Sequence, residues 1–502
     1  MFEPETAPSA TLLGLLQRGR GDGTLHALAA ERGEALAALD ACVTHDPRRD
    51  WQVENRSLYY ARLYMELEGP LAGLEAHLFH TDDLLDCDEA RTGLTLSVLG
   101  RLARYGRRDA LLLLRRYAAG GTNWAWALDE LAVCDDDAGL LALAAPVLAR
   151  FPEDAEGEAA LRSAVREAYE PRPWHLWAER HRRVAAATEQ APFALWQRQL
   201  ARPAQPPGWS TAAVLAWADE VPGEPSARPG GPAIGPAGPA AGSAGGLPGD
   251  PAGSPHGPSA LERRAAAAAR CLKAVAGPGD RALLLRAARD GADGARIAAL
   301  RHLADLDDPA VPELLELAAT DSSDVVVSGA LGTLCRMRGA RIMERARSWA
   351  AAPLDSALAD ASVRLLAAAG DERDAPLVAA ALRRRLAVGG VDAHGLGALV
   401  EGAARLRATA AVPVLRLLYA ETASSVLRGL TARALAATDP CFGSGAAVEC
   451  LWDCEESTRE LAARHVETNG NARVLDRLRR LAADPAEEAQ VHDAVRGRLT
   501  GP

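Results

Sequence analysis

A repeated spacing of apolar residues constrains the fold of this 502-residue chain more than any other feature. In residues 294–317, apolar side chains recur every three or four positions in two successive stretches, which is the period of an amphipathic helix. Asp308 and Pro309 stand between the stretches, where they end one helix and open the next. The segment therefore predicts two helices joined by a short corner.

The same pair of helices recurs along the C-terminal half. The second helix of successive pairs is anchored at Val311, Ile342, Leu377 and Val412, which are 31, 35 and 35 residues apart. Periods in this range are typical of stacked helical hairpins. The sequence thus predicts an all-α fold, an α-solenoid in which each helical pair packs only against its neighbours.

Further helices are expected on both sides of residue 222, with a less regular rhythm in the N-terminal half. After residue 258 the expected ranges, besides 294–317, are 261–275, 281–289, 324–337, 340–350, 356–369, 374–386, 394–406, 412–420, 424–437, 445–454, 457–466, 472–483 and 486–499. Before residue 222 they are 53–67, 71–80, 88–105, 109–119, 124–133 and 137–151.

One segment between the two halves has a different composition. Residues 222–258 contain 10 prolines and 11 glycines and almost no large apolar side chains. Such a segment cannot bury enough apolar surface to offset the entropy lost on ordering. We expect a flexible, disordered Pro/Gly/Ala-rich linker between an N-terminal array, residues 1–221, and a C-terminal array, residues 259–502.

Composition limits the classes of partner. Lys273 is the only lysine among 56 basic residues, which indicates a GC-rich, bacterial genome and makes the arginines weak evidence for phosphate binding. The net charge of −11 argues against general affinity for nucleic acid or anionic membranes, because both attract a positive field. We therefore expect a protein partner rather than nucleic acid or a membrane.

The chain also shows no export or membrane signal. Its start, residues 1–6, places acid and proline where a signal peptide carries positive charge, and no apolar stretch approaches the roughly 20 residues that cross a bilayer. The eight cysteines are scattered, and several lie in apolar helical stretches, as reduced thiols do. The sequence predicts a cytoplasmic protein.

Residues 294–317 resemble a HEAT-type repeat, particularly the short form found in phycobilisome-lyase-like repeat proteins. The resemblance rests on the Arg-x-Ala-Ala-Leu run at 296–300, on Asp308-Pro309 and on Val311-Pro312. It implies a right-handed superhelix of helix pairs whose second helices line a concave face. It carries no reaction with it, because such repeats mostly serve as scaffolds.

No catalytic or cofactor motif is found. The sequence lacks a Gly-x-Ser-x-Gly elbow, a credible Ser/His/Asp grouping and a dinucleotide fingerprint. We expect neither an enzyme nor a cofactor.

The first candidate metal set precedes an acidic run. Glu75, His77 and His80 stand before residues 82–89, four of which are Asp and one Glu. This spacing is neither His-Glu-x-x-His nor a calcium loop, so we favour a solvated acidic corner over a metal site.

The second candidate metal set contains Cys441, Cys450, Cys454 and His465. It has no Cys-x-x-Cys pair, and Cys450 and Cys454 are one helical turn apart. We favour buried packing of these side chains over zinc ligation.

Two groups of residues are candidates for a partner-binding surface. The first combines aromatic and basic side chains, as base-stacking surfaces do: Trp174, Trp177, Arg180 and Arg183. The second consists of arginines on expected second helices, which can point into a concave groove: Arg345, Arg383, Arg384 and Arg416. Glutamates on equivalent helices argue against one continuous channel for an anionic ligand: Glu313, Glu316 and Glu449.

The leading hypothesis is a non-enzymatic scaffold of HEAT-like repeats that binds a protein on its concave faces. The alternative is a nucleic-acid-binding protein, because some alkylpurine DNA glycosylases are similar to this fold. A chromophore-lyase-like activity is a minor alternative that rests on the resemblance alone.

Overall fold

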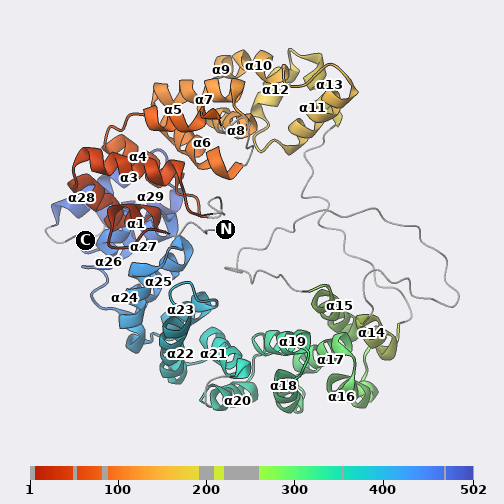
Figure 1. Cartoon of the computed structure of the whole chain (residues 1–502). Coiled ribbons are helices and arrows are strands. Elements are labelled where there is room, and N and C mark those ends of the chain that lie inside the picture. The colour runs from red at the N-terminus through yellow and green to blue at the C-terminus, as the bar shows by residue number, and fades with distance from the viewer. Residues whose placement is uncertain are drawn as a thin grey trace. The chain divides into compact units, whose positions relative to one another are not determined.

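The computed structural model of the chain describes residues 6–48, 52, 54–81, 89–190, 209–219, 259–351, 356–468 and 471–500 (Figure 1). Every regular element in these ranges is a helix, which confirms the expected all-α class. The chain divides into two compact units: unit 1 joins residues 1–201 with residues 418–502, and unit 2 contains residues 202–417.

The helices of unit 1 come from two separate stretches of the chain. The first stretch contains α1 (Leu12–Gln17), α2 (Gly21–Ala29), α3 (Arg32–Thr44), α4 (Ser57–Glu66), α5 (Ala72–Leu78), α6 (Glu89–Arg104), α7 (Arg108–Gly120), α8 (Trp124–Cys134), α9 (Asp137–Ala142), α10 (Ala144–Leu148), α11 (Ala155–Glu167), α12 (Arg172–Ala178) and α13 (Arg182–Gln190). The second contains α25 (Ser425–Thr438), α26 (Ala446–Cys450), α27 (Glu456–His465), α28 (Ala472–Ala483) and α29 (Ala489–Thr500).

The helices of unit 2 are continuous in sequence apart from residues 220–258. They are α14 (Thr211–Ala218), α15 (Ala260–Val275), α16 (Arg281–Asp290), α17 (Asp293–Asp305), α18 (Val311–Ala319), α19 (Asp324–Leu334), α20 (Ala340–Ala350), α21 (Ala357–Ala369), α22 (Ala375–Gly389) and α23 (Leu396–Arg405). Helix α24 (Val412–Glu421) contains the boundary between residues 417 and 418.

Most expected helices are present with bounds that differ by a few residues, but two are shorter than expected. The expected helix 137–151 is divided into α9 and α10 near Pro146, because proline has no N–H to donate and its ring crowds the preceding turn. The expected helix 445–454 ends at Cys450, because Asp453 lies in a turn where its carboxylate accepts hydrogen bonds from Arg428 and from the Glu455 N–H.

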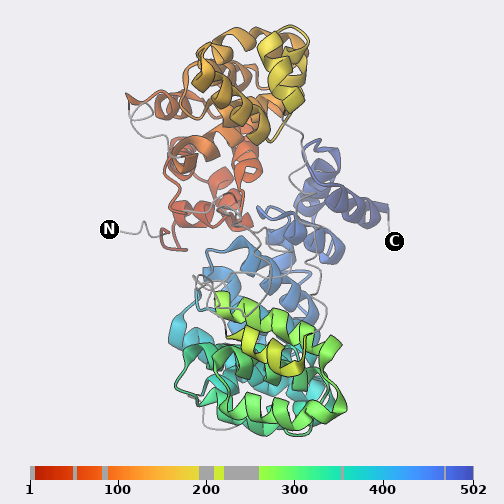
Figure 2. The ribbon, with the colours of Figure 1, turned by 90° about the vertical axis from the view of Figure 1, so that its right-hand side faces the viewer.

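Alternate helices pack on one another in unit 2. Helix α15 packs on α17, α17 on α19, α19 on α21, and α21 on α23, while α16 and α22 pack on the members of this row that follow them in sequence. Figure 2 shows these helices in green to cyan. Their apolar faces are buried between successive pairs, as the spacing of apolar residues predicts.

The corner aspartates of two repeats each pair with an arginine from the preceding helical pair. Arg281 forms two hydrogen bonds with Asp308, at 2.7 and 3.0 Å, and Arg347 forms two with Asp374, also at 2.7 and 3.0 Å. In both cases the arginine precedes the aspartate by 27 residues. Each contact joins the second helix of one pair to the corner of the next pair.

Three helices share the same C-terminal turn. After the last residue of α4, α17 and α23 comes a leucine and then a residue with a left-handed backbone: Glu68 at φ 48°, Asp307 at φ 53° and Arg407 at φ 48°. In each turn the next N–H bonds to the carbonyl five residues earlier. One of these helices belongs to unit 1 and two belong to unit 2.

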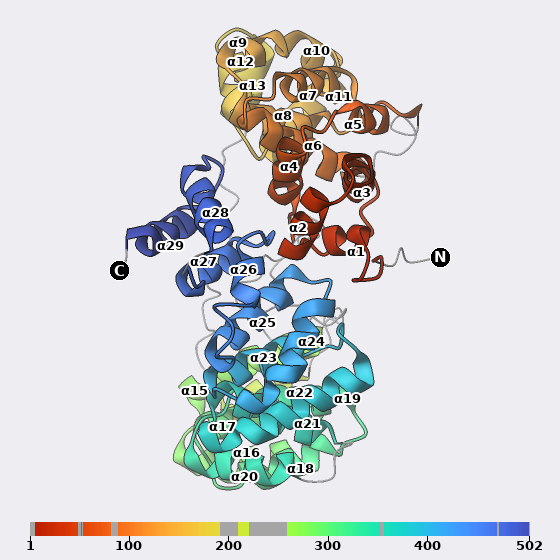
Figure 3. The same ribbon diagram turned by 90° about the vertical axis from the view of Figure 1, so that its left-hand side faces the viewer.

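Within unit 1, the two stretches of chain approach each other at backbone level. Helix α26 packs on α2, and Figure 3 shows the two helices side by side. A Cβ on Gly21 would lie 2.0 Å from the carbonyl oxygen of Glu449, and one on Gly19 would lie 2.4 Å from Sγ of Cys454. Gly19 also has a left-handed φ of 67°. Only glycine fits this approach at both positions.

Charged side chains also join the two stretches of unit 1. Arg20 forms an ion pair with Glu449 at 3.0 Å, and the buried Arg56 donates to the carbonyl oxygen of Ala423 at 2.8 Å. Glu54 accepts hydrogen bonds from the N–H and the hydroxyl group of Ser425 at 2.7 and 2.9 Å. Residues about 370 to 430 positions apart thus satisfy one another's polar groups.

The two compact units have different boundaries from the two arrays expected from the sequence. Residues 418–502, expected to belong to the C-terminal array, form one compact unit with residues 1–201. The physical reason is the set of polar contacts and close backbone approaches just described. The expected linker, residues 222–258, lies outside the described residues.

Candidate binding site

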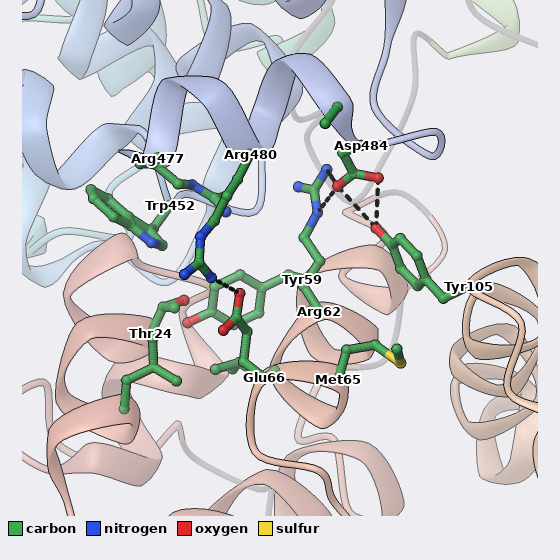
Figure 4. A pocket seen from close by; sticks show the side chains of 13 residues that line it. Thr24, Tyr59, Arg62, Met65, Glu66, Tyr105, Trp452, Arg477, Arg480 and Asp484 are labelled. Atoms are coloured by element: carbon green, nitrogen blue, oxygen red, sulfur yellow. Dashed lines mark hydrogen bonds and ion pairs between the residues drawn. The ribbon is translucent and has the colours of Figure 1, made fainter. Parts of the chain in front are cut away.

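A cavity of unit 1 lies between its two stretches of chain and has a volume of about 370 Å³. Its walls come from α2, α4, the end of α6, the turn after α26, and α28 (Figure 4). The volume lies in the range of small ligand pockets or of a pocket for one or two side chains.

Helical spacing aims the polar side chains at the cavity. On α4, Tyr59, Arg62 and Glu66 are three and four residues apart and therefore share one face. On α28, Arg477 and Arg480 share a face in the same way. These two faces form opposite walls of the cavity.

Two of the three arginines in the wall are paired with carboxylates. Arg62 donates to Asp484 at 2.9 Å and to the buried Glu487 at 2.9 Å. Arg480 donates to Glu66 at 2.8 Å, as Figure 4 shows. Burial lowers the pKa of Arg62, but the charges of Glu487 and Asp484 raise it by more, so the net pKa is above the ordinary value. Both guanidinium groups therefore have compensated charge.

Two tyrosines contribute hydroxyl groups with protein partners. Tyr105 donates to both carboxylate oxygens of Asp484 at 3.0 Å, and Tyr59 donates to the carbonyl oxygen of Arg20 at 2.8 Å. Burial raises the pKa of both phenols, so both stay protonated at neutral pH. They act as fixed donors and not as bases.

Arg477 is the third arginine and differs from the other two. Its Nε donates to the carbonyl oxygen of Leu451 at 3.1 Å, and its guanidinium lies over the indole of Trp452, 5.3 Å from the ring centroid. Within the described part of the chain, no carboxylate oxygen lies within 4.0 Å of this guanidinium. Burial and the positive charges of Arg62 and Arg459 lower the pKa of Arg477 to about 9, so it is still a cation at neutral pH.

The acid stability of unit 1 depends on Glu487. Burial raises the pKa of Glu487. Hydrogen bonds from Arg459 and the charges of Arg459 and Arg62 lower it by more, so that the pKa falls from the ordinary 4.5 to about 2. Ionised Glu487 therefore stabilises the unit fully above about pH 4.5, and this contribution is lost as the pH falls towards 2.

We expect amide hydrogen exchange in α4 and α27 to accelerate as the pH falls through this window, after correction for intrinsic exchange rates. In a Glu487→Gln variant the pH dependence should be shallower, because the group that changes charge is gone. Equal slopes for the variant and the unchanged chain would contradict this assignment.

The structure places two of the expected surface residues in the interior, which corrects the sequence interpretation. Trp174 and Trp177 are 2% and 0% exposed, and their rings contact edge to face at 5.0 Å. The Trp177 Nε1 donates to the carbonyl oxygen of Leu140 at 2.8 Å. Trp174 also contacts Trp124 of α8 edge to face at 6.3 Å, so both rings are packed in the interior and neither offers a face to a partner.

Of the two arginines expected beside them, one has a structural role. Arg183 pairs with Glu158 at 2.5 Å and donates to the carbonyl oxygens of Phe151 and Pro152 at 2.9 Å. Arg180 is exposed.

The four arginines expected on second helices lie in unit 2 and are not gathered in one pocket. Arg384 lines a pocket of about 310 Å³ with Asp360 and His394, whereas Arg345, Arg383 and Arg416 do not line it. Arg345 pairs with Glu316. Arg383 and Arg416 are exposed.

The candidate metal residues have other contacts. Glu75 pairs with Arg116 at 2.6 Å, and a ring nitrogen of His77 lies 2.9 Å from the carbonyl oxygen of Arg91. Residues 82–88 of the acidic run lie outside the described residues.

In the cysteine set, Cys450 is buried against the hydroxyl group of Tyr419 at 3.1 Å, while Cys441 is exposed. Cys454 accepts a hydrogen bond from Arg428 at 3.3 Å. Among the described residues, no three His, Cys, Asp or Glu side chains are grouped so that they could hold a metal ion.

Comparison with protein-family models and with curated protein sequences finds no match for this chain. None of the helices in the described ranges has the length and apolar character needed to span a bilayer.

Proposed function

We propose that this protein is a non-enzymatic interaction protein, built of HEAT-like helical pairs stacked as an α-solenoid, and that it binds a protein partner. The observation that carries the proposal is the row of alternate helices α15, α17, α19, α21 and α23, each packed on the next. Stacking of alternate helices is what a solenoid of hairpins requires.

Two further features support the repeat interpretation. The same arginine-to-aspartate contact, 27 residues apart, joins successive pairs at Asp308 and Asp374. The same left-handed helix ending occurs in both units. Since the apolar residues serve to bury one pair against the next, binding is left to the polar faces and to pockets between helices.

The burial of Trp174 and Trp177 removes one argument for the alternative of nucleic-acid binding, because neither ring is available to stack on a base. The net charge of −11 also opposes it. The cytoplasmic location stays a prediction from the sequence.

Affinity capture with the full chain tests the proposal. The tagged protein is incubated with an extract of the source organism, with and without nuclease, beside a bait of an unrelated helical-repeat protein of similar net charge. We expect one protein to co-purify in near-stoichiometric amount with this chain alone and to persist after nuclease treatment. Recovery of nucleic acid in place of a protein, or of nothing specific, would overturn the proposal.

A further inference from the structure

The cavity of unit 1 contains one positive charge that no carboxylate among the described residues pairs with. Arg62 is held by Asp484 and Glu487, and Arg480 is held by Glu66. No carboxylate in the described ranges pairs with Arg477. Removing a cation from water without an opposite charge costs free energy, and a bound anion offsets that cost.

The guanidinium of Arg477 is held in a fixed orientation. Its Nε donates to the carbonyl oxygen of Leu451, and its Cζ lies over the Trp452 ring. Arg473, one turn earlier on α28, lies over the same indole at 5.6 Å. The two terminal nitrogens of Arg477 are therefore left to donate end-on, which is the geometry that a carboxylate accepts with both oxygens.

The surroundings of the cavity favour a singly charged group. Of the three arginines in the cavity wall, Arg62 and Arg480 are paired with carboxylates, and among the described residues Arg477 alone is not. A phosphate group, with more negative charge at neutral pH, would be repelled by the carboxylates of Glu66 and Asp484. A carboxylate matches the single charge.

Exposed apolar side chains flank this charged site. Leu28 on α2 is 40% exposed and Met65 on α4 is 37% exposed, and both line the cavity. An apolar rim beside an aromatic ring and an arginine is the composition of side-chain pockets in protein interfaces. A partner that fills this site therefore combines a carboxylate with neighbouring apolar side chains.

We propose that the cavity bounded by α2, α4 and α28 binds an acidic peptide segment of the partner, with an Asp or Glu carboxylate on Arg477 and flanking apolar side chains on Leu28 and Met65. This inference rests on the proposed function, because it names the part of a protein partner that this surface recognises.

A library of random peptides displayed on phage, selected on the immobilised full chain, tests the proposal. We expect the selected peptides to share an Asp or Glu next to an apolar residue. A selected peptide, synthesised with a fluorescent label, then reports affinity by anisotropy. We expect Arg477→Gln to weaken its binding about tenfold or more, and Arg477→Lys to retain part of the affinity.

Two further variants make the result specific. Met65→Glu adds a carboxylate at the exposed rim without removing a buried group. It should therefore weaken binding of an acidic peptide even if Arg477→Gln proves to disturb the fold. Arg384→Gln alters an arginine that lines the pocket of unit 2 and should leave binding unchanged. Hydrogen exchange in α28 identifies a variant that is unfolded.

The outcomes separate this proposal from the proposed function. Selected peptides without a shared acid, or binding that both Arg477→Gln and Met65→Glu leave intact, would overturn the site. A partner captured from extract that binds both variants normally supports the scaffold and overturns this site. Selection of acidic peptides that depend on Arg477 supports the site even where capture fails and the scaffold proposal falls.

Discussion

Replacing Asp453 with alanine is expected to destabilise unit 1 by about 3–5 kcal/mol. Asp453 and Arg428 are both fully buried side chains, joined by hydrogen bonds of 2.8 and 3.1 Å. Without the carboxylate, the charge of Arg428 stays buried and unpaired, because its remaining contacts are the carbonyl oxygen of Gly19 and Sγ of Cys454. One of its terminal nitrogens, Nη1, has no hydrogen-bond partner in the described part of the chain.

Urea unfolding followed by hydrogen exchange in α25 and α27 measures this loss within the full chain. Asp493→Ala is the matched control, because Asp493 pairs with Arg496 on the exposed surface of the same unit. A surface pair of this kind is worth less than about 1 kcal/mol. Similar losses for the two alanine variants would show that Asp453 is not buried as described.

Much of the fold could be predicted because helix period and corner residues are local signals. The corner at Asp308 is predicted from its place between two apolar stretches, and in the structure Arg281 pairs with this aspartate. The short helix α26 could not be predicted, because the helical pattern of residues 445–454 continues past the point where Asp453 bonds to Arg428.

The candidate site was missed because its walls are far apart in sequence. Arg62 and Asp484 are 422 residues apart, and no local pattern indicates that they meet. A weak local signal did exist: Tyr59, Arg62 and Glu66 place polar groups on one face of a helix that is otherwise largely buried. The spacing of Trp174 and Trp177 likewise does not distinguish burial from exposure, because a buried pair and an exposed pair on one helix face have the same spacing. In the structure both are buried.

The second large effect is expected at Glu487, which joins the two stretches of unit 1. Its carboxylate binds Arg459 at 2.7 and 2.8 Å and Arg62 at 2.9 Å. Glu487→Gln leaves two guanidinium groups without their shared charge, one of them buried, and should cost about 3 kcal/mol or more. Arg62→Met removes the bonds of Arg62 to Glu487 and Asp484, which join the two stretches. Arg459 keeps its bond to Glu487 in this variant.

The packing of residues 1–201 with residues 418–502 is the basis of the candidate site, and a double-mutant cycle tests it most directly. The unfolding free energy of unit 1 is measured for the unchanged chain, Arg62→Met, Glu487→Gln and the double variant, with hydrogen exchange in α4 as the readout. We predict a coupling energy of about 1–3 kcal/mol between these residues, which are 425 positions apart. Additive effects, with a coupling energy of zero within error, would contradict the account.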